Sequence, residues 1–211
     1  MGARLKKSFS EYWGLLLFPL LSVLLAIAIA VENPQVLSNR EAVVFTYWEH
    51  AFKGQGGYDA PAGAGNQISF AGLEPGDILV GGYEDCAYGR FSHAGIYIGN
   101  NQVIEGYVDL GISEQSIDHY WNYSKICLLR VEAPGEMKMK AVEYVRKYKG
   151  RLFYPLAFKN GERFWNCTKI MWKAYAVQGL DLVTADDFWI SPDALYNSTK
   201  LIIIREEGRS L

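Results

Sequence analysis

The chain has 211 residues, of which 50% are hydrophobic, and a formal net charge of −2. This length and composition favour one domain with a substantial core and short extensions over two full domains. The charge is small and no run of Lys and Arg alternates with aromatic residues, which argues against nucleic acid as a partner.

The amino-terminal segment has the composition of a membrane signal. Arg4, Lys6 and Lys7 precede an uncharged stretch over residues 12–31, and about 20 such residues span the hydrocarbon core of a bilayer as a helix. A basic flank before an apolar run is also typical of a secretory signal peptide. We therefore expect residues 1–31 to be a membrane anchor or a cleaved signal. In both cases the remainder of the chain is exported to the periplasm or cell exterior.

Residues 32–72 are predicted to form a leading helix and a linker. Ser38 to Glu41 has the pattern of a capping box, so the helix is expected to begin at Ala42 and to end near Lys53. The following residues, 54–65, are rich in glycine and lack periodicity, which indicates a loop.

Short apolar runs with a period of two follow, and they predict antiparallel strands. The strands are expected at 77–80, 94–98, 103–108 and 126–131. The turn residues over 99–102 join the second and third of them as a hairpin. Cys127 lies in the last run and is predicted to be a buried structural thiol.

The second half of the chain predicts two helices. One covers about 136–149, and the other begins near Cys167 and ends at Gly179. Their inward-facing residues are expected to be Met139, Val142, Val145 and Tyr148 in the first, and Ile170, Met171, Ala174 and Tyr175 in the second. Ser191 and Pro192 predict a helix cap, and 201–204 predicts an edge strand. This order of elements indicates an α+β domain.

Three cysteines, an odd number with no Cys-x-x-Cys pair, indicate neither a disulfide framework nor a four-ligand zinc site. Cys86 has no evident role. Cys86 and His93 lack further ligands at suitable spacing, so no metal site is expected.

Cys167 is a candidate nucleophile because the amino terminus of a helix stabilises a thiolate. His93, at the start of a predicted strand, is a candidate general base, and Glu105 in the next strand can orient the imidazole. Each of the three also has an ordinary structural explanation when taken alone. The combination favours catalysis. His50 and His119 are predicted to be structural.

The hairpin imposes a condition on this site. A two-residue turn at Asn100 and Asn101 would put His93 and Glu105 on opposite faces of the sheet. An odd-length loop or a β-bulge is needed to bring both side chains to one face.

Three segments then resemble the NlpC/P60 superfamily: residues 73–80 (Leu-Glu-Pro-Gly-Asp-Ile-Leu-Val), 92–100 (Ser-His-Ala-Gly-Ile-Tyr-Ile-Gly-Asn) and 103–106 (Val-Ile-Glu-Gly). Because His93 precedes Cys167, the order matches the circularly permuted papain-like branch. That branch includes bacterial YiiX/YycO-like proteins and the lecithin retinol acyltransferase group. The resemblance implies a catalytic domain over 73–211, with an antiparallel sheet packed against helices.

Residue by residue, the resemblance implies that Cys167 is the nucleophile, His93 the base and Glu105 the third member. It also implies that Tyr154 contributes to an oxyanion pocket. Bacterial members often have Ser-Glu-Leu after the cysteine, where this chain has Thr168-Lys169-Ile170. This departure bears on substrate preference, and Lys169 near the helix start can help to hold a thiolate.

The implied function is a cysteine hydrolase that cleaves amide bonds through a thioester, without a cofactor, with cell-wall peptides as substrates. Acyl transfer or ester hydrolysis on lipids, which the permuted branch also performs, is an alternative. A non-catalytic binding domain is a third possibility, although none of the three site residues is lost.

Overall fold

The computed structural model describes residues 20, 24, 27, 31, 43–53, 65–84, 86–87, 89–154, 157–183 and 188–208. Contacts divide the chain into two units, Met1–Arg40 and Glu41–Leu211. In the first unit only Leu20, Leu24, Ile27 and Val31 are described, and all four are helical and exposed. The segment expected to enter a membrane, 12–31, thus lies almost entirely outside the described residues. Within those that are described, no helix has the length and apolar character to cross a bilayer.

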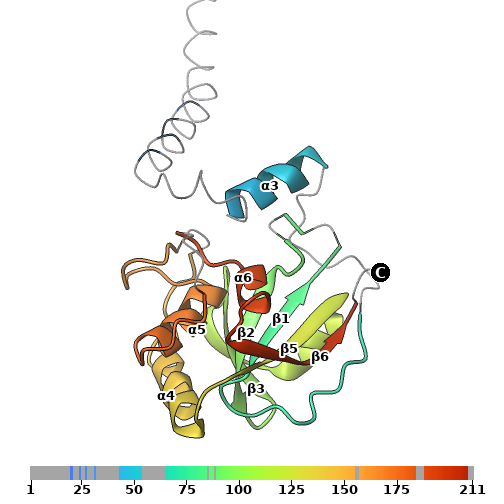
Figure 1. Cartoon of the computed structure of the whole chain (residues 1–211), viewed down its shortest axis with the longest axis vertical. Coiled ribbons are helices and arrows are strands. Elements are labelled where there is room, and N and C mark those ends of the chain that lie inside the picture. Colours follow the sequence, from blue (N-terminus) through green and yellow to red (C-terminus); the bar gives the residue numbers. More distant parts are fainter. Residues whose placement is uncertain are drawn as a thin grey trace, which may run out of the picture. The chain divides into compact units, whose positions relative to one another are not determined.

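The second unit is an α+β fold built on a six-stranded antiparallel sheet, with few helices (Figure 1). In chain order its elements are α3 (Val43–Phe52), β1 (Ile78–Gly82), β2 (His93–Gly99), β3 (Gln102–Tyr107), β4 (Gly111–Ser116), the 3₁₀ helix η1 (Ile117–Asn122), β5 (Lys125–Val131), α4 (Gly135–Arg146), α5 (Cys167–Ala176), α6 (Pro192–Tyr196) and β6 (Leu201–Glu207). The strand order across the sheet is β4-β3-β2-β1-β5-β6.

Most of the predicted elements are confirmed, with shifts of a few residues at their ends. The predicted third strand is one residue too long, because β3 ends at Tyr107 and Val108 is an exposed turn residue. Strand β4 and helix η1 were not predicted from the sequence. The predicted glycine-rich loop, 54–65, lies outside the described residues except for Gly65.

The two faces of the sheet carry different cores because side chains alternate along each strand. Ile78 and Val80 of β1 pack against α4 and α5 on one face, while Leu79 belongs to a second cluster with Tyr120 and Tyr123 on the other. Figure 1 shows α4 and α5 together on one side of the sheet. The opposite face is therefore left for η1 and the segment after it.

Helix α5 buries the residues that its spacing predicts, since Ile170, Met171, Ala174 and Tyr175 are all inaccessible. Helix α4 departs from the prediction at Met139, which is 48% exposed, and ends at Arg146, before Tyr148. Its buried residues are Lys138, Ala141, Val142 and Val145. The prediction for Met139 is wrong because the helix turns Lys138 inward, toward a buried carboxylate.

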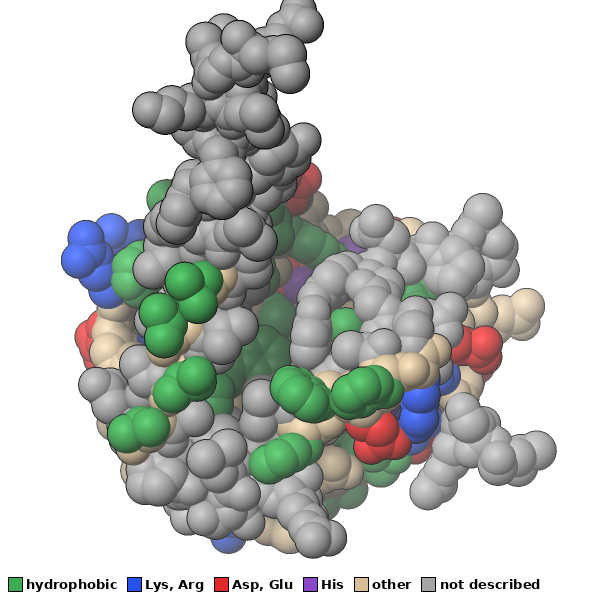
Figure 2. All heavy atoms as spheres, turned by 90° about the horizontal axis from the view of Figure 1, so that it is seen from above, with side chains coloured by type: hydrophobic (Ala, Val, Ile, Leu, Met, Phe, Trp, Pro, Cys, Tyr) green, Lys and Arg blue, Asp and Glu red, His purple; other side chains and the backbone are tan. Residues whose placement is uncertain are grey.

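Helix α3 carries three exposed aromatic side chains, Phe45, Trp48 and Phe52. Figure 2 looks onto the face of the molecule that includes α3 and shows exposed hydrophobic side chains there. On the same helix, His50 Nδ1 lies 2.6 Å from the carbonyl oxygen of Cys86, so His50 donates a hydrogen bond to the loop after β1.

The buried carboxylate toward which Lys138 of α4 turns belongs to Asp77, which is fully inaccessible to solvent. Lys138 Nζ of α4 lies 3.2 Å from Asp77 Oδ1, and Arg130 Nη2 of β5 lies 2.9 Å from Asp77 Oδ2. Its neighbour Gly76 has φ +99°, and a Cβ atom there would lie 2.7 Å from Lys138 Cβ. The Gly-Asp pair thus allows α4 to approach the sheet and supplies the charge that Lys138 needs.

Replacing Lys138 with Met is expected to lower the free energy of unfolding by about 3 kcal/mol, because it leaves the buried charge of Asp77 with fewer partners. Lys140→Met is the matched control. It removes the exposed Glu136–Lys140 pair from the same helix, and exposed pairs contribute about 0–1 kcal/mol. Urea denaturation of both variants checks this, and equal losses would contradict a structural role for the Asp77–Lys138 pair.

Candidate active site

Cys167 is the first residue of α5 and is 8% exposed. Asn166 precedes it in an extended conformation as the N-cap, and its side-chain oxygen accepts a hydrogen bond from Lys169 N at 2.8 Å. Thr168 Oγ1 donates to the carbonyl oxygen of Ile190 at 2.5 Å and fixes the first turn from the other side. The thiol therefore lies at the positive end of a helix whose start is well anchored.

The register of the β2–β3 hairpin brings His93 and Glu105 to the same face of the sheet. Asn100 and Asn101 form a two-residue turn, with φ values of 54° and 57°. Tyr97 pairs with Val103 and Gly99 with Gln102, so Ile98 is an extra residue in β2. This bulge places Glu105 opposite Gly95, two residues from His93. The sequence required an odd-length loop or a β-bulge in this hairpin, and the structure has a bulge at Ile98.

His93 and Glu105 are in direct contact, with His93 Nε2 2.9 Å from Glu105 Oε2. A carboxylate only accepts hydrogen bonds, so Nε2 carries the proton and Nδ1 remains to interact with the thiol of Cys167. Burial opposes the charged form of His93, but hydrogen bonds to Cys167 and Glu105 and the charge of Glu105 outweigh it and raise its pKa to about 10. The arrangement favours an imidazolium beside the cysteine.

Aromatic side chains enclose the imidazole. The Tyr107 ring stacks on His93 at 4.5 Å between centroids and 13° between planes, and the Tyr123 ring lies nearly parallel at 6.2 Å. Burial, followed by the charge of Glu105, raises the pKa of the Tyr107 hydroxyl, which therefore stays neutral. His93 is held in one plane and largely shielded from water.

Glu105 has two partners that the sequence did not identify. The Tyr120 hydroxyl donates to Glu105 Oε2 at 3.1 Å, and His119 Nε2 lies 3.1 Å from Glu105 Oε1. Burial raises the pKa of Glu105, but hydrogen bonds from His119 and His93 lower it more, so the carboxyl is ionised. The prediction that His119 is a purely structural residue therefore misses its contact with the site. His119 follows strand β4, which was not predicted, so nothing in the sequence indicated its contact with Glu105.

Tyr154 and Lys169 lie close to Cys167 in the chain but have other partners in the structure. Tyr154 is half-exposed, its amide donates to the carbonyl oxygen of Trp165 at 2.8 Å, and its ring stacks on Phe164 at 5.1 Å. Lys169 is buried, and its ammonium donates to the carbonyl oxygen of Phe164 at 2.9 Å. Lys169 thus stabilises the loop that precedes Cys167 through a hydrogen bond to its backbone.

The other two thiols, Cys86 and Cys127, are buried. Cys127 lies in the helix-side core, as predicted, and burial raises the pKa of its thiol to about 12. This environment disfavours the thiolate of Cys127.

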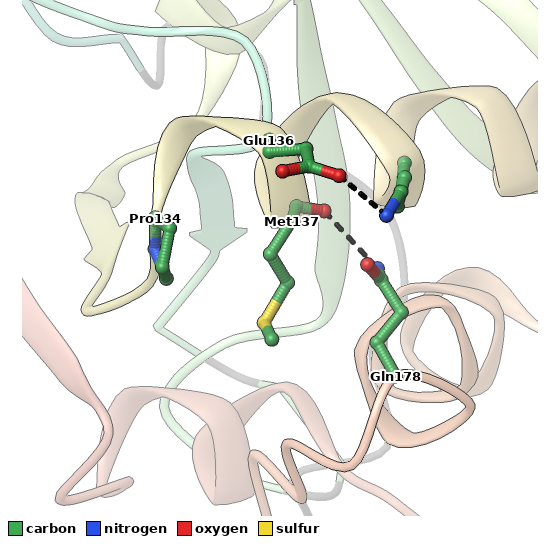
Figure 3. A pocket seen from close by; sticks show the side chains of 5 residues that line it. Pro134, Glu136, Met137 and Gln178 are labelled. Atoms are coloured by element: carbon green, nitrogen blue, oxygen red, sulfur yellow. Dashed lines mark hydrogen bonds and ion pairs between the residues drawn. The ribbon is translucent and has the colours of Figure 1, made fainter.

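Among the residues that the structure describes, no three or more His, Cys, Asp or Glu side chains are arranged to bind a metal ion. A hollow lies between the start of α4 and the turn after α5 (Figure 3). It is lined by Pro134, Glu136, Met137, Lys140 and Gln178. Gln178 Nε2 donates to the carbonyl oxygen of Met137 across it, at 3.0 Å, so this hollow is partly closed by its own side chains.

At Gly95 the backbone of β2 lies close to the Tyr120 hydroxyl and the Glu105 carboxylate. A Cβ atom at this position would collide with the Tyr120 hydroxyl and lie 3.4 Å from Glu105 Oε2. Gly95→Ala is therefore expected to lower the free energy of unfolding by about 1–3 kcal/mol. Tyr120→Phe, added to it, is expected to restore part of the loss by removing the oxygen.

Gly135→Ala is the control for this prediction, because a Cβ atom there meets nothing within 4 Å. Thermal or urea unfolding of the three variants measures the difference. If Gly95→Ala were as stable as Gly135→Ala, the close packing of Tyr120 against β2 would be contradicted.

No protein-family model and no curated protein matches the sequence. Among solved structures, the chain is similar to a crystal structure described as that of the metalloprotein YiiX from Escherichia coli O157:H7. The TM-score is 0.53, the sequence identity is 15%, and the match covers 64% of this chain and 97% of that chain. At this identity the likeness shows the fold alone. The chain therefore has a YiiX-like α+β fold.

Proposed function

We propose that the chain is a cysteine hydrolase of the circularly permuted papain-like (NlpC/P60) class that cleaves amide bonds through a thioester on Cys167. The observation that carries this proposal is that His93 Nε2 contacts Glu105 while the same imidazole also interacts with Cys167. The YiiX-like fold supports it, because the permuted papain-like class places histidine, orienting residue and cysteine in this order.

In the acylation step, the sulfur of Cys167, whose proton is held by the His93 imidazolium, forms a bond to the substrate carbonyl carbon. The negative charge on the carbonyl oxygen is stabilised by the backbone amide of Cys167 at the start of α5. As the tetrahedral species collapses, the C–N bond breaks and His93 returns the proton to the leaving amine. Glu105 holds the ring and stabilises its positive charge.

In the deacylation step, His93 takes a proton from water, and the resulting hydroxide attacks the thioester carbonyl. The C–S bond breaks, the acid is released, and the proton stays on His93 beside the freed sulfur of Cys167. Tyr154 is assigned here to the substrate side of the site, since it is half-exposed in the extended stretch beside Trp165. Its hydroxyl can supply a further hydrogen bond to the oxyanion.

Peptides of the cell wall are the proposed substrates, and residues 12–31 are proposed to hold the domain at the exported face of a membrane.

Exposed apolar side chains favour a second candidate function, the transfer or hydrolysis of lipid acyl groups. Leu152, which is 86% exposed, precedes the strand-like contact of Phe153 with Trp165, and Gly111 packs directly against Arg151 and Leu152. Val108 and Leu110, in the turn between β3 and β4, are exposed as well. These side chains suit an apolar substrate.

Alkylation of the full-length chain with a limiting thiol reagent tests the proposal. Cys167, which is 8% exposed, is expected to react before Cys86 and Cys127, which are 1% exposed or less, including below neutral pH. His93→Ala is expected to slow this labelling, and to lower the rate of hydrolysis about 10²–10⁴-fold on any substrate found. Mass spectrometry of the modified peptide measures which cysteine reacts.

The pH dependence of hydrolysis gives a second readout. Because the folded protein holds the His93 proton more tightly than the unfolded chain, the imidazolium persists at neutral pH and is lost as the pH rises through about 10. Hydrolysis is expected to fall over that range, since His93 no longer has a proton for the leaving amine. His50→Ala is the control histidine variant. If Cys167 reacts no faster than an ordinary thiol, and His93→Ala leaves its alkylation rate unchanged, the chain is a binding domain instead.

A further inference from the structure

Two histidines approach one buried carboxylate in this site, one at each oxygen. His93 Nε2 lies at Glu105 Oε2, and His119 Nε2 of η1 lies at Glu105 Oε1, at 2.9 Å and 3.1 Å. The Tyr120 hydroxyl, also from η1, completes the set at Oε2. The mechanism above uses only His93, so the role of the second histidine remains to be explained.

The hydrogen bonds of His119 fix where its protons are. Its Nδ1 lies 2.6 Å from the carbonyl oxygen of Ser116, and a carbonyl oxygen only accepts, so Nδ1 carries a proton. A neutral imidazole has a single N–H. Its Nε2 would then direct a lone pair at Glu105 Oε1, and two acceptors would face each other in a buried contact.

Within the described part of the chain, neither of these two atoms has another hydrogen-bond partner. Both His119 Nε2 and Glu105 Oε1 are buried, and leaving such atoms unpaired is costly. A proton between them satisfies both at once. The His119 side chain is 27% exposed, so this proton can exchange with solvent.

We propose that His119 and Glu105 share this proton, which makes His119 a positioning residue that sets the charge Glu105 presents to His93. This inference rests on the proposed function. With the proton in place, Glu105 is held at both oxygens and part of its charge is offset. Without it, His119 Nε2 repels Oε1, and Glu105 is free to rotate away from His93.

Among the residues that the structure describes, the charged group in contact with His119 is Glu105. Glu105 and Tyr107 approach it from β3, Tyr120 packs on it within η1 at 4.6 Å between ring centroids, and His93 of β2 lies beyond Glu105. Both tyrosine hydroxyls are neutral, since burial raises the pKa of each. The state of the His119–Glu105 contact therefore follows a single shared proton.

The test compares His119→Gln with His119→Ala in the full-length chain and measures the rate of Cys167 alkylation by iodoacetamide against pH. Gln donates a hydrogen bond to Glu105 but does not titrate. It is expected to keep the rate within about threefold of the unmodified chain and to remove one ionisation from the profile. Ala leaves Oε1 unpaired and is expected to slow alkylation about tenfold. His50→Gln, a histidine outside the site, is expected to leave the profile unchanged.

Three results would overturn the proposal: an Ala variant with the unmodified pH profile, a Gln variant no faster than the Ala variant, or a Gln variant that retains every ionisation. Imidazole nitrogen shifts from NMR of the isotope-labelled full-length chain give a check without mutation, because a neutral His119 ring bonded to an ionised Glu105 would also overturn it. The proposed function fails separately, if His93→Ala leaves Cys167 alkylation unchanged.

Discussion

The one-residue bulge at Ile98 is the constraint on which the site depends. The hairpin between β2 and β3 has a two-residue turn, and without the bulge every β3 side chain would change faces relative to β2. Glu105 would then point to the helix side of the sheet, away from His93. With the bulge, Glu105 faces His93, and Gly95 leaves space for the Tyr120 hydroxyl.

The fold buries two carboxylates and satisfies them in different ways. Asp77 is matched by Lys138 and Arg130, and it joins β1, β5 and α4. Glu105 is matched by His93, His119 and the Tyr120 hydroxyl. One buried carboxylate is thus bound by an ammonium and a guanidinium, and the other by two imidazoles and a hydroxyl.

The sequence predicted those parts of the fold whose pattern is local. Alternating apolar residues predicted β1, β2, β3 and β5, and the periodicity after Cys167 predicted α5. Strand β4 was missed because Ile112 is its one large apolar residue, the rest being small or polar as befits an edge strand. The contact of His119 with Glu105 was missed with it, since it exists only once β4 returns the chain beside β3. An odd-length loop or a bulge was foreseen as a requirement, but nothing local located the bulge at Ile98.

The order of the elements along the chain determines when the residues of the candidate site come together during folding. His93 and Glu105 lie on one short hairpin, and hairpins of this kind form in about 1–10 μs because their ends are close in sequence. Cys167 belongs to a helix that must pack on β2 and β3 across a long stretch of chain, which is a slower, non-local event. His93 and Glu105 are thus in place before Cys167 is in reach, and the candidate site forms only when the domain is complete.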